Sequence, residues 1–229
     1  MFFSQLRTLL PHFINLEFHQ KERWISPLLF STTVLLLFFF AAGRVEDEQV
    51  VTMFITQTLL TTFLALQLSF MRSFEAESQD RVYDLLRSYP INPSAWYLAK
   101  YLSTCLAALL VCFATLGLSL FFNAESNIEL FHWELLVVLS VAISGLVSIG
   151  ILLAQLTLGA KSKQILYPII YFPLTSPVLL GAVESARSIL NKGESLDALM
   201  SSWLGLLGVF SIIYFTLGIL FFEEVAKAE

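Results

Sequence analysis

Six apolar stretches divide this chain of 229 residues almost from end to end. Each is 18 to 26 residues long, and none has a Lys, Arg or Asp in its interior. A helix rises about 1.5 Å per residue, so about 20 apolar residues are needed to cross the roughly 30 Å hydrocarbon core of a bilayer. The sequence therefore predicts six membrane-spanning helices, at Trp24–Ala42, Val50–Met71, Tyr101–Phe122, Trp133–Leu158, Ile165–Ala182 and Trp203–Phe222.

The composition supports a membrane protein. Hydrophobic residues make up 57% of the chain and charged residues 14%, whereas a soluble domain has about 25% charged residues. The net charge is −5 and no basic stripe is present, which excludes a nucleic-acid-binding protein. A cleaved signal peptide is an alternative for the first stretch, but that stretch is longer than the roughly 7 to 15 residues of a signal core. We therefore expect an all-α, polytopic fold in one transmembrane domain, residues 1–229.

The positions of Lys and Arg predict the orientation in the membrane. Of the 13 basic residues, ten precede the first span, join spans 2 and 3 or spans 4 and 5, or follow span 6. The other side has only Arg44, Arg187 and Lys192. Because basic loops remain in the cytoplasm, both termini are predicted to be cytoplasmic.

The N-terminal segment, residues 1–23, has the pattern of an amphipathic helix. Phe2, Leu6, Leu9, Phe13 and Leu16 recur at spacings of three and four, which places them on one helical face. Such a helix lies along the membrane surface. Pro11 falls inside the pattern, so we expect a kink there or a helix that begins there. This helix either anchors the first span or has an additional mechanical role.

The segment 72–100, between spans 2 and 3, contains a second amphipathic pattern. Val82, Leu85, Leu86 and Tyr89 share one helical face, beside an acidic flank of Glu75, Glu77, Asp80 and Asp84. Pro90 ends this helix, and Asn92 followed by Pro93 predicts the start of the next one. A helix held between two spans either rests on lipid or docks into a groove of a soluble partner. Its acidic residues favour the partner, because cytoplasmic lipids are also anionic.

Span 5 is predicted to be bent. Pro168, Pro173 and Pro177 each remove a backbone hydrogen bond, and lipid cannot satisfy the carbonyls that are released. These carbonyls are therefore expected to face protein or a water-lined cavity. The bend is either a static kink or a hinge that lines a transport path, formed by Tyr167, Pro168, Tyr171, Pro173, Thr175 and Pro177. Residues 183–202 beyond it are predicted to form a short outer helix that precedes span 6.

No catalytic or metal-binding motif is apparent. The chain lacks HExxH, paired carboxylates, a nucleophile elbow and a GxxxxGK[ST] loop, so any ATP must be bound by another chain. Cys105 and Cys112 lie about 10 Å apart along one helix, too far for a disulfide, and are interpreted as packing residues. His132 beside Trp133 is either part of an interfacial aromatic belt or a haem ligand.

At the segment between spans 2 and 3 the chain resembles the CcmB family, the haem-exporter B subunits of cytochrome c maturation. The resemblance rests on Phe74-Glu75-Ala76-Glu77, on Tyr83-Asp84-Leu85-Leu86, on Pro90, and on Lys100. It continues in the run Phe172-Pro173-Leu174-Thr175-Ser176-Pro177 and at Glu17, and it covers nearly the whole chain. Arg81 departs from the family, which commonly has glycine there.

The resemblance implies the permease subunit of a type-2 ABC exporter in the bacterial inner membrane. Its partners would be a CcmA-like ATPase, CcmC-like and CcmD-like membrane subunits, and indirectly the periplasmic haem chaperone CcmE, with a homodimer of this chain as a further possibility. The chain itself would bind no cofactor; haem would be a substrate of the complex, and ATP would bind to the ATPase. The residues implied to contact the ATPase are Phe74, Glu75, Glu77, Val82, Asp84, Leu85, Leu86, Tyr89, Pro90 and Lys100.

Two alternatives remain open from the sequence. One is the permease of another type-2 exporter, for a lipid, a drug or a polysaccharide. The other is a membrane assembly scaffold that binds partners without transport, since the same cytoplasmic segment would serve it.

Overall fold

The computed structural model of the protein describes residues 2–19, 21–42, 47–79, 92–123, 133–157 and 163–227. These residues form helices joined by short connections, with no strand among them. The helices are α1 (Phe2–His19), α2 (Lys21–Ala42), α3 (Asp47–Gln79), α5 (Pro93–Phe122), α6 (Trp133–Leu156), α7 (Lys163–Lys192), α8 (Leu196–Met200) and α9 (Trp203–Lys227). The predicted all-α fold is confirmed for this part of the chain.

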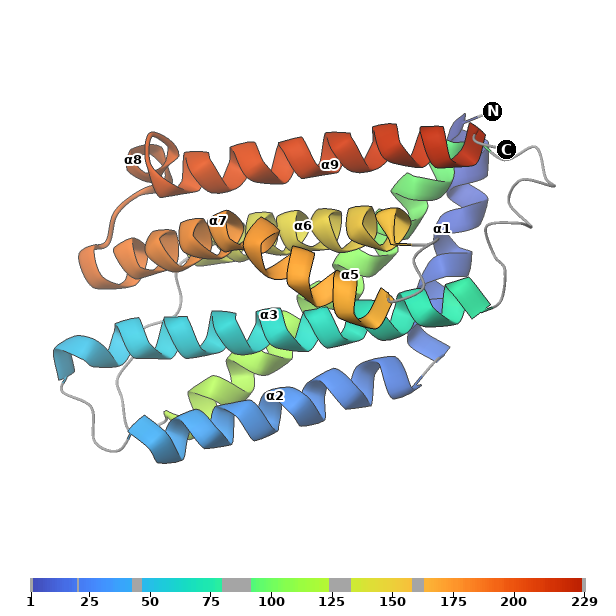
Figure 1. Ribbon diagram of the computed structural model, residues 1–229. Coiled ribbons are helices and arrows are strands. Elements are labelled where there is room, and N and C mark those ends of the chain that lie inside the picture. Colours follow the sequence, from blue (N-terminus) through green and yellow to red (C-terminus); the bar gives the residue numbers. More distant parts are fainter. Residues whose placement is uncertain are drawn as a thin grey trace.

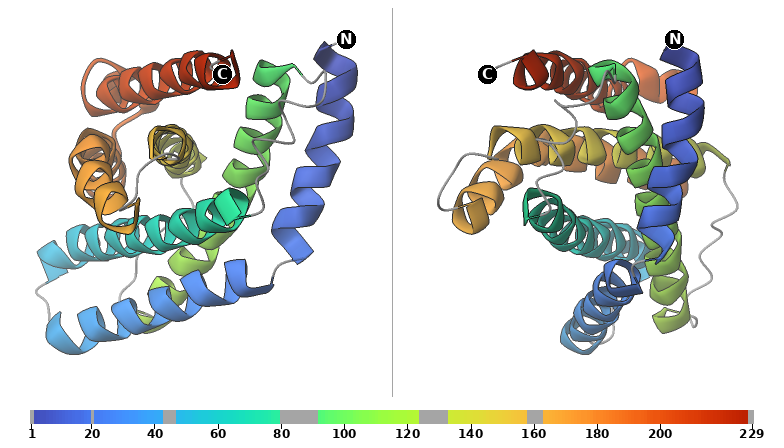
Figure 2. Two further views of the ribbon diagram at one scale, coloured as in Figure 1. Left: turned by 45° about the vertical axis from the view of Figure 1, so that its right-hand side comes forward. Right: turned by 90° about the vertical axis from the view of Figure 1, so that its right-hand side faces the viewer.

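Most of the long helices run side by side. In Figure 1, α2, α3, α6, α7 and α9 lie roughly parallel to one another, and α5 crosses them at a slant. α1 lies across one end of this bundle, next to the C-terminal end of α9, and the turned views of Figure 2 agree. A helix in that position has the direction expected along a membrane surface if the long helices cross the bilayer.

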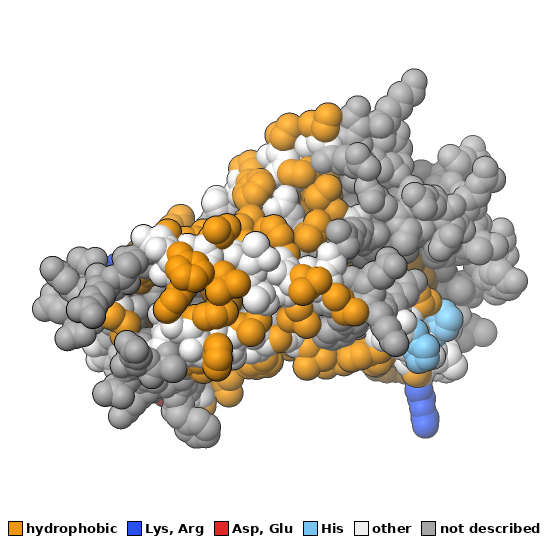
Figure 3. Space-filling model, turned by 90° about the horizontal axis from the view of Figure 1, so that it is seen from below, with side chains coloured by type: hydrophobic (Ala, Val, Ile, Leu, Met, Phe, Trp, Pro, Cys, Tyr) orange, Lys and Arg blue, Asp and Glu red, His pale blue; other side chains and the backbone are white. Residues whose placement is uncertain are grey.

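The hydropathy of these helices identifies a multi-pass membrane protein. Five of the described helices are long and apolar enough to cross a bilayer. The predicted first span lies on α2, whose described apolar part, Ile25–Ala41, has 17 residues and is shorter than the other five. On the face drawn in Figure 3, described hydrophobic side chains cover the middle, and histidine side chains and a protruding basic side chain lie toward one end.

Several helices extend beyond the apolar stretches that predicted them. α3 continues to Gln79, past Met71, and α5 begins at Pro93 rather than Tyr101. The predicted N-cap of α5 is confirmed, because the Asn92 side chain accepts a hydrogen bond from the Ser94 N–H at 3.0 Å. The segment 72–100 thus begins and ends as extensions of α3 and α5, and residues 80–91 between them lie outside the described residues.

The outer segment 183–202 is divided differently from the prediction. α7 does not end at Ala182 but continues to Lys192, and the short α8 follows it before α9. Gly193 lies between α7 and α8 with φ 64°, in the left-handed region that glycine adopts without steric cost. Only α8 corresponds to the separate outer helix that we expected.

α1 is a single helix that starts at Phe2 and passes through Pro11, so Pro11 does not begin a helix. Leu9 and Phe13, on its predicted apolar face, pack against the hydrophobic core. Glu17, one turn beyond Phe13, is also buried. The apolar face therefore contacts the helix bundle as well as any membrane surface.

α6 is the central helix of the bundle. It packs on α3, α5, α7 and α9, and all residues from Gly145 to Gln155 are buried. Gly150 is needed for this packing, because a Cβ there would overlap the Phe70 ring of α3. The second half of α6 is thus surrounded by other helices and has almost no exposed surface.

Candidate functional site

The six residues predicted in span 5 differ in their burial on α7. Tyr167, Tyr171 and Thr175 are buried inside the protein. Pro168 and Pro177 are half-buried, and Pro173 is exposed on the side of the helix away from Tyr171. A path-lining role within this chain is therefore compatible with the tyrosines and Thr175, whereas the prolines act through the shape of the backbone.

Aromatic rings join the N-terminal half of α7 to α3. The Tyr171 ring stacks on Phe63 with 5.4 Å between centroids and 5° between planes, and Phe70 meets Tyr171 edge-on at 6.4 Å. Tyr167 stacks on Tyr171 at 5.4 Å, and Phe172 meets Phe63 at the same distance. Such pairs stabilise a contact beyond their area burial alone. We call Phe63, Phe70, Tyr167, Tyr171 and Phe172 the aromatic layer.

The backbone carbonyl released by Pro177 has a partner that we did not predict. Pro177 has no N–H to donate to the carbonyl of Pro173, and the Ser176 hydroxyl donates to that oxygen instead, at 2.8 Å. The Thr175 hydroxyl also donates to a carbonyl of α7, that of Tyr171, at 2.7 Å, but no proline releases this carbonyl. Because the exposed Ser176 hydroxyl already donates to the Pro173 carbonyl, this carbonyl does not need a partner from a neighbouring helix or a cavity. α7 remains one helix through all three prolines and is visibly curved in Figure 1.

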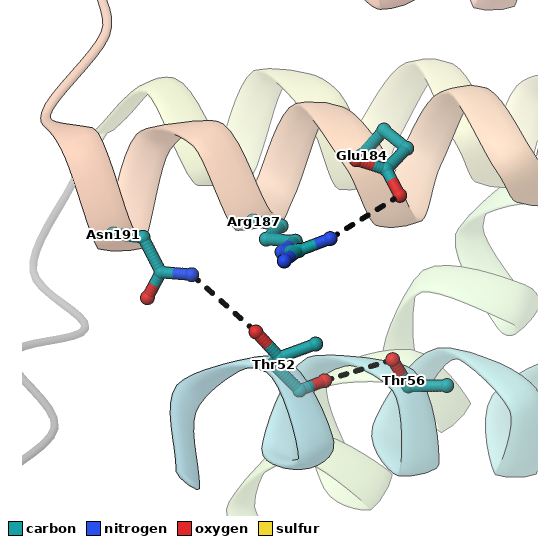
Figure 4. A network of polar contacts seen from close by, with 5 residues as sticks. All are labelled: Thr52, Thr56, Glu184, Arg187 and Asn191. Carbon is teal, nitrogen blue, oxygen red and sulfur yellow. Dashed lines mark hydrogen bonds and ion pairs between the residues drawn. The ribbon is translucent and has the colours of Figure 1, made fainter. Parts of the chain in front are cut away.

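The C-terminal end of α7 meets the N-terminal part of α3 through polar side chains (Figure 4). The Asn191 amide donates to the Thr52 hydroxyl at 3.4 Å, and the Thr56 hydroxyl donates to the Thr52 carbonyl at 2.8 Å. On α7 itself, Arg187 and Glu184 form an ion pair at 3.8 Å. The α3–α7 contact is thus aromatic near the middle of the bundle and polar at the C-terminal end of α7.

α1 holds the beginning of α5. The Gln5 side-chain oxygen accepts a hydrogen bond from the Asn92 N–H at 3.0 Å. The Phe13 ring meets Trp96 edge-on at 5.4 Å, and Trp96 in turn stacks on Phe222 of α9 at 4.7 Å. These contacts fix the point at which the chain enters α5, immediately after residues 80–91.

Lys100, predicted with the partner-binding segment, lies inside the protein. Its side chain is 2% exposed on α5, and its Nζ lies over the Phe13 ring of α1, 5.9 Å from the centroid. A soluble partner does not reach a side chain in this position without rearrangement of α1. The placement favours a role for Lys100 in holding α1 to α5.

The remaining residues predicted to bind the ATPase are at or beyond the limit of what the structure describes. Phe74, Glu75 and Glu77 belong to the last two turns of α3, without described side chains. Val82, Asp84, Leu85, Leu86, Tyr89 and Pro90 lie outside the described residues. Their role remains a prediction.

Within the described part of the chain, no group of three or more His, Cys, Asp or Glu residues is placed to hold a metal ion. Cys105 and Cys112 are free thiols on α5, and Cys112 is part of the hydrophobic core. His12 and His19 are on α1, and His132 lies outside the described residues.

Sequence reasoning missed the partners of these residues. Gln5 and Asn92, Thr52 and Asn191, and Phe63 and Tyr171 are each far apart in the sequence. A periodic pattern shows which face of a helix is apolar, but it does not show which other helix covers that face. Covariation between homologues is the sequence signal that reveals such pairs.

Residues 4–226 match the CcmB family, described as CcmB protein. The chain belongs to the CcmB family. The match extends from α1 to the end of α9, so it includes the aromatic layer, the polar contact between α3 and α7, and the α1–α5 junction. No curated protein matches the chain.

Membership in the CcmB family implies a membrane subunit of an ABC transporter in cytochrome c maturation. The family consists of transmembrane permease subunits rather than catalytic enzymes. The resemblance seen in the sequence is therefore confirmed at the level of the family and of its general role.

Proposed function

We propose that this chain couples ATP hydrolysis by a CcmA-like ATPase to haem export, or to the release of the haem-loaded periplasmic chaperone. It does so in the bacterial inner membrane with both termini in the cytoplasm. CcmC-like and CcmD-like membrane subunits complete the complex. Haem is a substrate of the complex, and ATP binds to the partner chain.

The observation that carries this proposal is the way the chain leads into and out of residues 80–91. α3 extends eight residues beyond its apolar stretch to Gln79, and α5 begins at Pro93 after the Asn92 cap. Gln5 and Phe13 of α1 contact the first turns of α5 from the side. Because this segment is joined directly to the ends of α3 and α5, a soluble partner that binds and moves it would also displace these two spans.

Leu86 is our proposed apolar contact with the ATPase. Leu86→Asp would place a charge in the groove of the partner, at a cost of about 2 kcal/mol or more of association if the side chain is enclosed there. We expect the variant to insert in the membrane but to lose the ATPase on co-purification. Leu86→Met, of similar size and polarity, is the matched control and is expected to retain it. Normal recovery of the ATPase with Leu86→Asp contradicts the proposed contact.

The two alternatives predict different results. A scaffold without transport would retain the ATPase but leave its ATP turnover independent of this chain. A permease for a lipid, drug or polysaccharide would couple to ATP, but its deletion would leave c-type cytochromes unchanged. Measuring ATP turnover of the purified complex and c-type cytochromes in a deletion strain distinguishes all three.

A further inference from the structure

The spans form two groups of three helices. α6, α7 and α9 contact one another most extensively, and α2, α3 and α5 form the second group, which is joined to the first mainly by the contact of α3 with α7. Figures 1 and 2 show α6, α7 and α9 together on one side, with α2 and α3 on the other and α5 crossing between. Such groups are natural candidates for rigid bodies.

The group of α6, α7 and α9 is closely packed from its middle to its outer half, which is the half predicted to be extracytoplasmic. A Cβ at Gly145 of α6 would approach a Val178 methyl of α7 to 3.2 Å. A Cβ at Gly181 of α7 would approach Leu207 and the Trp203 carbonyl of α9 to 3.0 and 3.1 Å. Small residues let the backbones come this close, and helices packed in this way do not slide or separate without losing many contacts.

The group of α2, α3 and α5 is held by buried hydroxyl groups. The Thr58 hydroxyl of α3 donates to Ser119 of α5 at 2.7 Å, and the Thr115 hydroxyl of α5 donates to Ser31 of α2 at 3.3 Å. Serine and threonine side chains are typical contacts between helices in a membrane. The outer half of this group is therefore also internally connected.

Between the two groups, the contact of α3 with α7 is aromatic at one level of the bundle and polar at another. Near the middle, the aromatic layer stacks the buried Tyr171 on the buried Phe63. At the outer end, the Asn191 to Thr52 hydrogen bond is long, 3.4 Å, and the Asn191 side chain is exposed. The guanidinium of Arg187 is bound only to Glu184 of its own helix among the described residues.

We propose that the outer ends of α3 and α7 form a gate that opens during the ATP cycle while the aromatic layer stays closed. This inference rests on the proposed function, since it assumes a cycle driven by the ATPase. Water replaces a hydrogen bond between exposed groups at little cost, whereas separating buried aromatic rings exposes apolar surface. Pro173 and Pro177 lie between the two contacts, where α7 has lost backbone hydrogen bonds and bends most readily.

The gate is tested by bridging its two sides. Thr52→Cys and Asn191→Cys are combined with Cys105→Ala and Cys112→Ala, and a short bis-methanethiosulfonate reagent, which forms a reducible disulfide with each thiol, joins the new cysteines in the assembled complex. A bridging reagent is required because the Asn191 amide nitrogen lies one bond beyond the position of a cysteine sulfur. We expect the bridged complex to remain assembled and to lose c-type cytochrome formation, and reduction of the bridge to restore it.

The matched control bridges two helices within one group. The hydroxyl oxygens of Ser31 and Thr115 are 3.3 Å apart, so Ser31→Cys with Thr115→Cys forms a disulfide on oxidation with little movement. This bridge is expected to leave c-type cytochrome formation unchanged. If the complex bridged between positions 52 and 191 forms c-type cytochromes at the unbridged rate, the outer ends do not separate and the gate is refuted. Normal c-type cytochromes in a strain without this chain would instead refute the proposed function, so the two failures are distinguishable.

Discussion

The side-chain oxygen of Gln5 accepts a hydrogen bond from the backbone N–H of Asn92, at 3.0 Å. Asn92 is the residue at which the chain leaves segment 80–91 and enters α5, and its own side chain caps that helix. Gln5 is on α1, which packs along the beginning of α5 through Phe13 as well. α1 therefore braces the junction between the proposed ATPase-binding segment and the spans.

Loss of this brace has a measurable local effect. Gln5→Ala removes one hydrogen bond at an exposed site, worth about 1 kcal/mol, so we expect amide hydrogen exchange at Asn92 to become roughly fivefold faster. Gln5→Glu keeps the acceptor oxygen and is expected to preserve protection. Exchange is followed by mass spectrometry of peptides that contain Asn92. Equal exchange in the Gln5→Ala variant and the unmodified protein would show that the N–H is protected by other contacts.

The orientation in the membrane is tested with single cysteines. The distribution of Lys and Arg predicts that Asn127 is extracytoplasmic and Gln79 cytoplasmic. Cysteines at these positions, in a chain with Cys105→Ala and Cys112→Ala, are expected to react with an impermeant thiol reagent from opposite sides of the membrane. Reaction of both from the same side would contradict the predicted arrangement of spans.

Gly218 provides a test of the packing between α5 and α9. A Cβ at this position would overlap the Tyr97 hydroxyl, so Gly218→Ala is expected to destabilise the protein by about 1 to 3 kcal/mol. Gly117→Ala is the matched control, because its Cβ meets nothing within 4 Å. Thermal unfolding in detergent compares the two variants.

Removing the Tyr97 hydroxyl should relieve the overlap. We expect Gly218→Ala combined with Tyr97→Phe to recover part of the stability that Gly218→Ala alone loses. No recovery, or an equal loss in Gly117→Ala, would mean that the contact between Tyr97 and Gly218 does not set the spacing of these helices.

The prolines of α7 distinguish a hinge from a static kink. Pro173→Ala with Pro177→Ala restores two backbone N–H donors and is expected to straighten α7. If the bend changes during the ATP cycle, the variant assembles normally but its ATP turnover is uncoupled from c-type cytochrome formation. Complex yield, ATP turnover and c-type cytochromes are measured on the same preparation. A parallel fall of yield and cytochrome, with normal activity per complex, leaves only the static role.

Local chemistry in the sequence determined the helices and several of their ends. Long apolar runs can satisfy their backbone in a membrane only as helices, so hydropathy alone located five of the six spans as long apolar helices. The Asn92 cap depends on a side chain two residues from its partner, and it was predicted correctly. The extensions of α3 to Gln79 and of α7 to Lys192 were not predicted. A helix can continue from the apolar core into polar sequence, so the end of an apolar run does not mark the end of the helix.

The tertiary structure decided which faces meet and what each polar residue does. Lys100 directly precedes an apolar stretch and was predicted to contact the ATPase, but α1 covers it with Phe13. Tyr171 and Pro173 are neighbours in one motif, yet Tyr171 is buried against Phe63 while Pro173 is exposed on the other side. The contact of Asn191 with Thr52 joins residues 139 positions apart. Burial and pairing of this kind depend on the positions of other helices, which hydrophobic periodicity along one helix does not encode.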